Sequence, residues 1–427
     1  MSATSTSERS RAAPRRLRGE VLAGKKYYFD GTHRTCEPAA TIERFRPAME
    51  PFGITRLADV TGLDRLPIST IIAIRPNATT LASGSGKGTS KAAATASALM
   101  EALEIAHAER ATLDSVYESH RVLSQDALVV AIDELPLVPD ALFNPDLPEH
   151  WVRGWDIVHD REMFLPRAST DFTVKPVSAG HSSFRVDSNG LASGNTIAEA
   201  VLSGLYECIE RDATTCWQHA IRRTGYAPRL VDASSVDDAG VNGLLEALQR
   251  ARLELYVFDL TTDTSVPTYG ALMHSGDGAP ATRMKGFGTH LDPAVAMSRA
   301  ITEAVQARAV YVAGTRDDVF DHRRRLIKVV APPIAAAAVD LLPAESRPDD
   351  SSSEDFGEDL HIVIDRLAAA GLNRVIVVDL RNPASNVPVV RVFVPGLEGD
   401  QGDHYVPGRR ARLHAAFGSV APLLAEV

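Results

Sequence analysis

The chain has 427 residues, of which 44% are hydrophobic and 23% are charged, as in an ordinary soluble globular protein. Its net charge of -10 at pH 7 lacks the basic excess that general nucleic-acid binding needs, so nucleic acid is not an expected partner. Its three cysteines, Cys36, Cys208 and Cys216, are too few and too scattered for a disulfide framework or a zinc cluster, which fits a reducing cytosol.

Residues 1–20 are rich in Ser, Thr, Ala and Arg and are predicted to form a disordered basic tail. The alternative is a basic arm that contacts an acidic peptide or partner. The segment lacks the apolar centre of a secretory signal, and no run of the chain is long enough to span a bilayer. We therefore expect a cytoplasmic protein with no membrane partner, whose ordered domain covers residues 21–427.

The first predicted elements surround a glycine-rich segment. Residues 69–75 (STIIAIR) have the pattern of a buried strand. A Gly/Ser-rich turn over residues 82–90 then leads into an Ala-rich helix over residues 91–113. An apolar run follows at residues 128–132, and the Pro-rich residues 135–147 are predicted to be a connecting loop.

Two further glycine-rich turns are predicted, and each precedes a helix. Residues 188–195 (SNGLASGN) form one of them, and a helix with a Thr as its N-cap covers residues 196–222. Residues 253–260 have the pattern of a strand. Residues 285–292 (KGFGTHLD) form the other turn, and a helix that begins with proline covers residues 293–314.

The C-terminal part begins with residues 343–359, which are acidic, rich in Ser and poor in apolar side chains. They are predicted to form an exposed, mobile loop. A helix over residues 360–370 follows, with buried strands over residues 374–379 and 387–394. Strands alternate with helices along the chain, so the fold class is α/β or α+β, with mixed sheets and long Ala-rich helices.

The helices after the three glycine-rich turns share one internal spacing of polar residues. The sets are Ser97, Glu101 and Glu104; Ser203, Glu207 and Glu210; and Arg299, Glu303 and Gln306. Each set is an i, i+4, i+7 series, which lies along one narrow stripe of its helix. Glu199 extends the second stripe by one turn, and apolar residues occupy the other side of that helix.

Three matching stripes predict a site for a cation and a phosphate group. A single acidic stripe is ordinarily a solvated face, but like charges one turn apart destabilise a helix, and three convergent stripes need a compensating cation. Oxygen ligands suit Mg²⁺ rather than Zn²⁺, and Mg²⁺ held by carboxylates usually binds substrate phosphates as well. A nucleotide is therefore the expected ligand, with Arg211 and Arg299 beside the stripes to pair with its phosphate oxygens.

Other motifs carry less information. Residues 84–88 (GSGKG) depart from the Walker pattern because Gly88 follows the lysine, so they form either an anion cradle or a plain strand-to-helix turn. His107 lies one turn beyond Glu104, where it serves either a structural hydrogen bond or proton transfer. No HExxH or GxSxG motif and no Cys-His-Asn arrangement is recognisable, which leaves hydrolases of those classes unsupported.

These segments resemble the YcaO family. Residues 97–104 (SALMEALE) are similar to the first ATP-binding motif of that family, and SNGLASGN with residues 203–212 (SGLYECIERD) is similar to the second. Residues 285–318, which contain RAITEAVQAR, are similar to the third. The resemblance covers residues 26–316 and continues less tightly to the C-terminus. It implies a YcaO-type α/β fold, usually a homodimer, with ATP and Mg²⁺ buried among these helices.

The resemblance also implies an activity on a ribosomally made precursor peptide. Family members phosphorylate the oxygen of a backbone amide, and a nucleophile then displaces phosphate. A Cys, Ser or Thr side chain gives an azoline, a sulfide donor gives a thioamide, and an amine gives an amidine. The implied metal ligands are Glu101, Glu104, Glu199, Glu207, Glu210 and Glu303. The implied nucleotide or phosphate contacts are Arg34, Thr41, Ser97, Asn195, Arg211, Arg299 and Gln306.

Two departures from the family pattern concern the chemistry. Ile105 follows Glu104, where the first motif normally ends Glu-Arg, and the C-terminal AAFGSVAPLLAEV lacks the proline-rich tail common in azoline-forming members. Segments such as YYFDGTHRTCEP and FVPGLEG resemble the subgroup that is paired with a TfuA-type partner and makes thioamides. Stand-alone azoline-forming or amidine-forming members share much of this, and a nucleotide-binding accessory factor without peptide chemistry is a further alternative.

Overall fold

The computed structural model describes residues 13–135, 137, 143–172, 183–224, 229–275, 283–315, 341–342, 348–399 and 406–417. The helices are α1 (Pro38–Phe45), α2 (Lys91–Glu109), α3 (His120–Asp126), α4 (Ile197–Thr224), α5 (Ala239–Arg250), α6 (Pro293–Ala313), α8 (Phe356–Ala369) and α9 (Arg409–Phe417). The strands are β1 (Arg16–Leu17), β2 (Glu20–Val21), β3 (Arg56–Asp59), β4 (Ser69–Ile74), β5 (Ser83–Gly88), β6 (Ser115–Ser119), β7 (Pro148–Asp156), β8 (Arg161–Pro166), β9 (Leu191–Ser193), β10 (Leu230–Val231), β11 (Glu254–Asp259), β12 (Thr268–His274), β13 (Arg283–Thr289), β14 (Leu341–Leu342), β15 (Ile376–Asp379) and β16 (Val389–Phe393). The mixture confirms the predicted α/β (α+β) class.

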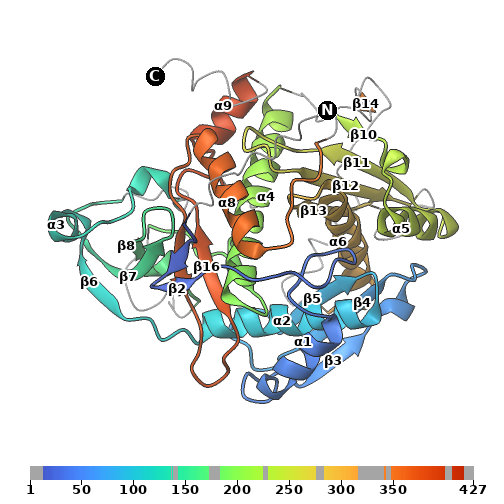
Figure 1. Cartoon of the computed structure of the whole chain (residues 1–427), viewed down its shortest axis with the longest axis horizontal. Coiled ribbons are helices and arrows are strands. Elements are labelled where there is room, and N and C mark those ends of the chain that lie inside the picture. Colours follow the sequence, from blue (N-terminus) through green and yellow to red (C-terminus); the bar gives the residue numbers. More distant parts are fainter. Residues whose placement is uncertain are drawn as a thin grey trace, which may run out of the picture.

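The long helix α4 runs through the middle of the molecule, between two sheets (Figure 1). One sheet has the order β6-β7-β15-β16-β9, with β8 paired to β7, and α4 packs on its β16 and β9. The other has the order β13-β12-β11-β10-β14, and α6 covers its β13 and β12. A third sheet, β3-β4-β5, packs on α2. The three helices that carry the polar stripes therefore each lie against a different sheet.

Two of the three predicted glycine turns are strands, β5 and β13. A Cβ atom on Gly86 would lie 2.1 Å from the backbone nitrogen of Ala98, and one on Gly288 would lie 2.1 Å from the carbonyl oxygen of Ala296. The glycines let α2 and α6 pack directly on the strand backbones, which any side chain would prevent. The prediction of turns was wrong here because glycine marks a close backbone approach as well as a turn. The segment before α4 does turn, at Gly190 (φ 76).

The predicted boundary of the disordered tail, at residue 20, is too late. Strands β1 and β2 pair as a short antiparallel hairpin, with Arg16 opposite Val21 and Leu17 opposite Glu20. Leu17 is only 2% exposed, and it packs in the same core cluster as residues of α4 and α8. One buried leucine is enough to order the segment, although its composition is that of a tail.

The prediction of an exposed, mobile loop over residues 343–359 is wrong for its last residues, 356–359, whereas residues 348–354 have no helix or strand, as a loop would. Residues 343–347 lie outside the described part, but α8 begins at Phe356, with the Asp355 side chain accepting from the backbone of Gly357 and Glu358. Asp359 is 0% exposed. The Ser and Asp residues that suggest disorder serve here as helix caps and buried hydrogen-bond partners.

Most of the remaining elements follow the predictions, with small shifts of their ends. Strand β4, strands β11, β15 and β16, and helix α6 with its proline start are confirmed. The structure adds the Asp292 side-chain cap and the left-handed Gly314 at the end of α6. The hairpin of β7 and β8 was missed, and the apolar run over residues 128–132 forms a single bridge, at Val129, and the start of a short 3-10 turn. Part of the predicted loop over residues 135–147 lies outside the described residues. Among the described residues, no helix is long and apolar enough to cross a membrane.

Candidate active site

A cavity of about 1030 Å³ lies where α2, α4 and α6 come together. The thirteen side chains that the family resemblance implies as metal ligands or nucleotide contacts all line this cavity. They are Arg34, Thr41, Ser97, Glu101, Glu104, Asn195, Glu199, Glu207, Glu210, Arg211, Arg299, Glu303 and Gln306. The structure thus brings the three stripes together, while the ligand that each residue binds stays a prediction.

The stripes face the cavity because the other faces of the helices are packed. On α2 the small residues Ala94 and Ala98 lie against the glycines of β5 and are 0% exposed. On α4 the apolar side, including Cys208, packs on the sheet, and the Cys208 thiol donates to the carbonyl of Val392 at 3.4 Å. On α6 the alanines pack on β13. Once each helix is fixed on its strand, its polar residues have only the cavity to face.

Glu199 is held by several donors at the edge of the cavity. Its carboxylate accepts from Arg34 Nη1 at 3.2 Å, from the Thr35 hydroxyl at 2.8 Å and from Asn195 Nδ2 at 3.2 Å. The hydroxyl of Thr41 donates to the other side-chain atom of Asn195, Oδ1, at 3.0 Å. This carboxylate is 2% exposed, and Arg34 is its charge partner within the chain.

Glu303, on α6, faces a lysine of β5. The Nζ of Lys87 donates to its carboxylate at 2.8 Å. Burial disfavours the ionised form of Glu303, but Lys87 and the two nearby arginines outweigh it, so the pKa of Glu303 lies below its usual range. Next to this pair, Gln306 donates to the Ser85 hydroxyl at 2.9 Å, and the backbone nitrogen of Ser85 donates to Glu101 at 3.0 Å. Strand β5 therefore links the stripe of α2 to that of α6.

The other three glutamates are not compensated in this way. Burial raises the pKa of Glu104 well above its usual value, and the charges of Glu207 and Glu101 raise it further. Burial also raises the pKa of Glu207, although Arg211 lies 3.6 Å from its carboxylate. For Glu210, burial and then the charge of Glu303 raise the pKa to about 7. These carboxylates lie close enough to repel one another, and a cation between them would relieve that repulsion.

The donor set fits Mg²⁺ together with phosphate groups. In the described part of the chain, no three His, Cys, Asp or Glu side chains are grouped to hold an ion by themselves. Mg²⁺ is usually held by one or two carboxylates, with substrate phosphates and water as the other ligands, so pairs of these glutamates suffice. Arg299 contributes a buried Nε that has no hydrogen-bond partner among the described residues, which suits an anionic ligand in the cavity.

Lys87 and Thr35 are contacts that the sequence did not single out. The signal for Lys87 is the alternation in GSGKG: because side chains alternate along a strand, the glycines that face α2 put Ser85 and Lys87 on the opposite side, toward α6. Thr35 gives no sequence signal beyond its position next to Arg34. Both become evident only from the packing of β5 and of the N-terminal segment on the helices.

His107 has a structural role, which is the first of its two predicted alternatives. Its Nδ1 donates to the carbonyl of Leu103 at 2.6 Å, its Nε2 accepts from the Ser385 hydroxyl at 2.7 Å, and its ring stacks on Phe52 at 4.3 Å. Burial lowers its pKa. The ring is outside the cavity and both nitrogens are occupied, so it is not placed for proton transfer there.

A family model described as YcaO cyclodehydratase, ATP- and Mg²⁺-binding, matches residues 85–398 of the chain. An uncharacterized protein of Methanothermobacter thermautotrophicus is 36% identical over 392 residues, which are 88% of this chain and 97% of that protein. An uncharacterized protein in the tfuA 3′ region of Rhizobium leguminosarum bv. trifolii is 36% identical over 417 residues, which are 92% of this chain and 96% of that protein.

Solved structures share the fold. A heterocyclase in complex with substrate and cofactor superimposes with a TM-score of 0.76 at 22% identity, over 92% of this chain but only 57% of the heterocyclase. YcaO from Methanopyrus kandleri, bound with AMPPCP and Mg²⁺, superimposes with a TM-score of 0.67 at 23% identity, over 90% of this chain and 100% of that protein. The family model spans residues 85–398, and this range contains α2, α4 and α6, the three helices that carry the stripes.

Proposed function

Because the chain belongs to the YcaO family, which binds ATP and Mg²⁺, we propose that it uses ATP to activate a backbone amide of a ribosomally made precursor peptide. The observation that supports this most is the convergence of three glutamate stripes on one cavity that also holds Arg34, Arg211 and Arg299. Carboxylates for a cation beside guanidinium groups for phosphate suit phosphoryl transfer, where positioning and charge neutralisation supply most of the catalysis.

The proposed reaction has two steps. The amide oxygen attacks the γ-phosphorus of ATP, the bond from that phosphorus to the β,γ-bridging oxygen breaks, and ADP leaves. A nucleophile then attacks the activated amide carbon, and phosphate departs with the former amide oxygen. With sulfide as the nucleophile the product is a thioamide. With a Cys, Ser or Thr side chain it is an azoline, and the protons of the nucleophile and of the amide nitrogen are released as the C=N bond forms.

The proposed roles follow the charges of the cavity. Arg34, Arg211 and Arg299 bind phosphate oxygens, because a guanidinium can donate two parallel hydrogen bonds to them. The polar groups of Thr41, Ser97, Asn195 and Gln306 orient the nucleotide. The glutamates Glu101, Glu104, Glu199, Glu207, Glu210 and Glu303 hold Mg²⁺ and shape its surroundings. Bound Mg²⁺ neutralises charge on the transferred phosphoryl group.

A sulfide nucleophile and a protein partner are the finer part of the proposal. The Rhizobium relative is named for its place beside tfuA, and its 36% identity spans nearly the whole of both chains. This supports a TfuA-type partner that delivers sulfur, and hence a thioamide product. We also propose a homodimer, as the family resemblance implies. Light scattering of the purified protein tests the dimer, because a mass near 46 kDa, that of one chain, contradicts it.

Mass spectrometry of a candidate precursor peptide tests the proposal. The peptide is incubated with the protein, ATP, Mg²⁺ and a sulfide donor, with and without the TfuA-type partner. Exchange of oxygen for sulfur is the expected result. Loss of one water instead identifies an azoline or an amidine and removes the sulfide part alone. ATP binding with no change in any peptide and no ATP hydrolysis contradicts the proposal and leaves a nucleotide-binding accessory factor.

A further inference from the structure

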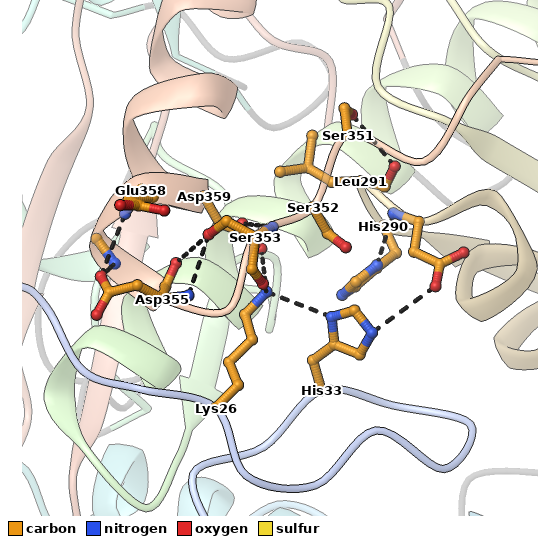
Figure 2. A network of polar contacts seen from close by, with 12 residues as sticks. Lys26, His33, His290, Leu291, Ser351, Ser352, Ser353, Asp355, Glu358 and Asp359 are labelled. Carbon is orange, nitrogen blue, oxygen red and sulfur yellow. Dashed lines mark hydrogen bonds and ion pairs between the residues drawn. The ribbon is translucent and has the colours of Figure 1, made fainter. Parts of the chain in front are cut away.

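Lys26 is a buried cation outside the cavity. Its ammonium contacts His33, the carbonyl of Ser353 and the carboxylate of Asp359 (Figure 2). The side chains of Lys26 and Asp359 are both 0% exposed and form an ion pair, which joins the N-terminal segment to α8. The Nζ of Lys26 also donates to the carbonyl of Ser353 at 2.8 Å. Removing two charges from water costs desolvation free energy that their mutual attraction repays only in part. A buried ion pair is therefore weak evidence that its two residues serve stability alone.

The backbone around Lys26 is fastened to the same segment. The nitrogen of Lys26 donates to the carbonyl of Glu354 at 2.8 Å, and Lys25 and Asp355 form an antiparallel bridge. The nitrogen of Gly24 donates to the side chain of Asp355 at 3.2 Å. Residues 24–26 are thus held at a fixed place before the chain continues into the cavity wall.

His33 carries the connection from Lys26 to α6. Its Nδ1 lies 3.3 Å from the Nζ of Lys26, and its Nε2 lies 3.7 Å from a carboxylate oxygen of Asp292 (Figure 2). Burial and the charge of Lys26 lower the pKa of His33 to about 4, so the ring is neutral at pH 7. A neutral ring that accepts at Nδ1 carries its proton at Nε2, on the side that faces Asp292. Asp292 is the N-cap of α6, which carries Arg299 and Glu303.

Arg34 follows His33 directly and enters the cavity. The nitrogen of Arg34 donates to the carbonyl of Tyr28 at 2.9 Å, and the nitrogen of Tyr28 donates back at 3.1 Å, so residues 28–34 form a closed hairpin. From the end of this hairpin, Nη1 of Arg34 reaches Glu199 at 3.2 Å and Ser203 at 3.3 Å. Lys26 is therefore connected to both ends of the hairpin. Its backbone lies just before Tyr28, and its ammonium contacts His33, which lies just before Arg34.

We propose that Lys26 is a positioning residue, whose ammonium, paired with Asp359 and in contact with His33, fixes hairpin 28–34 so that Arg34 meets the phosphates of the bound nucleotide. The inference rests on the proposed phosphate contact of Arg34. It assigns the C-terminal segment 353–359 a part in nucleotide binding, although none of its residues lines the cavity. A small displacement of Arg34 is costly because charged contacts in a site depend steeply on geometry.

A double-mutant cycle tests the coupling. The variants Lys26→Met, Arg34→Ala and their combination are titrated with AMPPCP and Mg²⁺ by calorimetry, with the folded fraction of each measured by circular dichroism. Losing a charge-assisted contact weakens binding roughly 10- to 100-fold, and this is expected for Arg34→Ala. Lys26→Met is expected to weaken binding roughly tenfold. Because Lys26 acts through Arg34, the double variant is expected to bind within about twofold of Arg34→Ala.

A matched control separates this from a loss of stability. Arg75 is another buried cation, 3% exposed, whose ion pair with Glu109 joins the end of β4 to the end of α2, and neither residue lines the cavity. Arg75→Met is expected to lower the melting temperature without weakening nucleotide binding by the folded protein. If Lys26→Met does not fold, Asp359→Asn loosens the same ammonium at constant side-chain size and enters the cycle in its place.

Three results overturn the inference. If the losses from Lys26→Met and Arg34→Ala add fully in the double variant, or if Lys26→Met binds as wild type does, Lys26 has only a structural role. Normal binding by Arg34→Ala overturns the proposed phosphate contact of Arg34 together with this inference. Additive losses overturn the inference alone and leave the proposed function standing.

Discussion

Helix α4 has acidic side chains on two faces, and the two faces differ in how their charges are balanced. On the face away from the cavity, Asp212 is 0% exposed and accepts from Arg410 Nε and Nη2, both at 2.9 Å, and from the nitrogen of Glu398 at 2.9 Å. The same Arg410 donates to Asp263 at 2.6 Å. Every charge in this cluster has a partner within the chain, so it fastens α9 to α4.

On the cavity face the balance is incomplete: Glu207 is partly buried and lies 3.6 Å from Arg211, and Glu210 is buried beside Glu303. The pKa of Glu210 is raised to about 7 by burial and by the charge of Glu303. Only one residue, Arg211, separates Glu210 from Asp212 along the helix. Burial of an acidic residue therefore says little by itself about function. The contrast shows that the informative feature is an incompletely balanced charge beside a cavity, since there a ligand can supply the opposite charge.

The largest expected effect comes from neutralising the cavity face. In Glu207→Gln and Glu210→Gln, ATP-dependent turnover of peptide is expected to fall roughly 100- to 1000-fold, as when one electrostatic contact to a transition state is lost. The free energy of unfolding without ligands is expected to hold or rise, because a repelling charge is removed. Peptide turnover and urea denaturation measure the two. Glu246→Gln on α5, whose side chain is 68% exposed, is the control. Wild-type turnover by both cavity variants contradicts the glutamate site.

Removing the cation from the cluster of Asp212, Asp263 and Arg410 is expected to lower the stability of the protein and to leave its nucleotide affinity unchanged. Arg410→Met leaves Asp212 and Asp263 buried without their cation, which costs about 3 to 5 kcal/mol of unfolding free energy. Urea denaturation measures the loss. Calorimetry with AMPPCP and Mg²⁺ is expected to give an unchanged affinity for the folded fraction, since none of the three residues lines the cavity. An affinity loss above tenfold at unchanged stability would make this face part of the site.

The sequence predicts the cavity face well and the balanced face not at all. Each stripe follows from helical periodicity alone, so Glu101, Glu104 and their counterparts on α4 and α6 are visible in one dimension. The pairing of Asp212 with Arg410 spans 198 residues, and no local pattern announces it. Lys87 lies between these cases, because its orientation follows from strand alternation once β5 is known to be a strand.

The errors in the fold have the same origin. Glycine in β5 and β13 permits a helix to touch the strand, and that contact exists only after the sheets have formed. Likewise, the segments that contain Leu17 and Ser353 have the composition of disordered chain. Leu17 becomes ordered because it packs in a core formed by other elements, and Ser353 because its backbone nitrogen donates to Asp359. Local propensity predicts elements, whereas tertiary contacts decide where order begins.

Ligand-induced stabilisation sharpens the contrast between the two faces. At a concentration of ATP and Mg²⁺ about 100 times the dissociation constant, the free energy of unfolding is expected to rise by about 2.7 kcal/mol. The contribution of Mg²⁺ to this rise is the difference between the rise measured with ATP and Mg²⁺ and the rise measured with ATP and EDTA. Glu210→Gln is expected to lose most of that contribution. Arg410→Met is expected to keep the full rise from a lower baseline. Equal loss in both variants would mean that the two faces act as one site.

The smallest expected effect concerns the other balanced cluster, around Lys26 and Asp359. His33 is neutral when folded, with a pKa of about 4, and it faces Lys26 from its own segment, Asp292 and His290 from the start of α6, and the charge of Asp350. The unfolded chain protonates this histidine near pH 6.5, so its contribution to stability is full above that pH and is lost as the pH falls toward 4.

The loss attributable to His33 is expected to be about 2 to 3 kcal/mol between pH 7 and pH 4, measured by urea denaturation across that range. His33→Gln keeps an acceptor for Lys26 and a donor for Asp292 but does not titrate, so its stability should fall less steeply with acid than that of wild type. His290, whose pKa is also lowered by burial, still titrates in the variant, so some acid dependence remains. The exposed His150→Gln is the control. Parallel curves for wild type and His33→Gln would mean that the pKa of His33 is the same in the folded and the unfolded chain, which contradicts the lowered pKa.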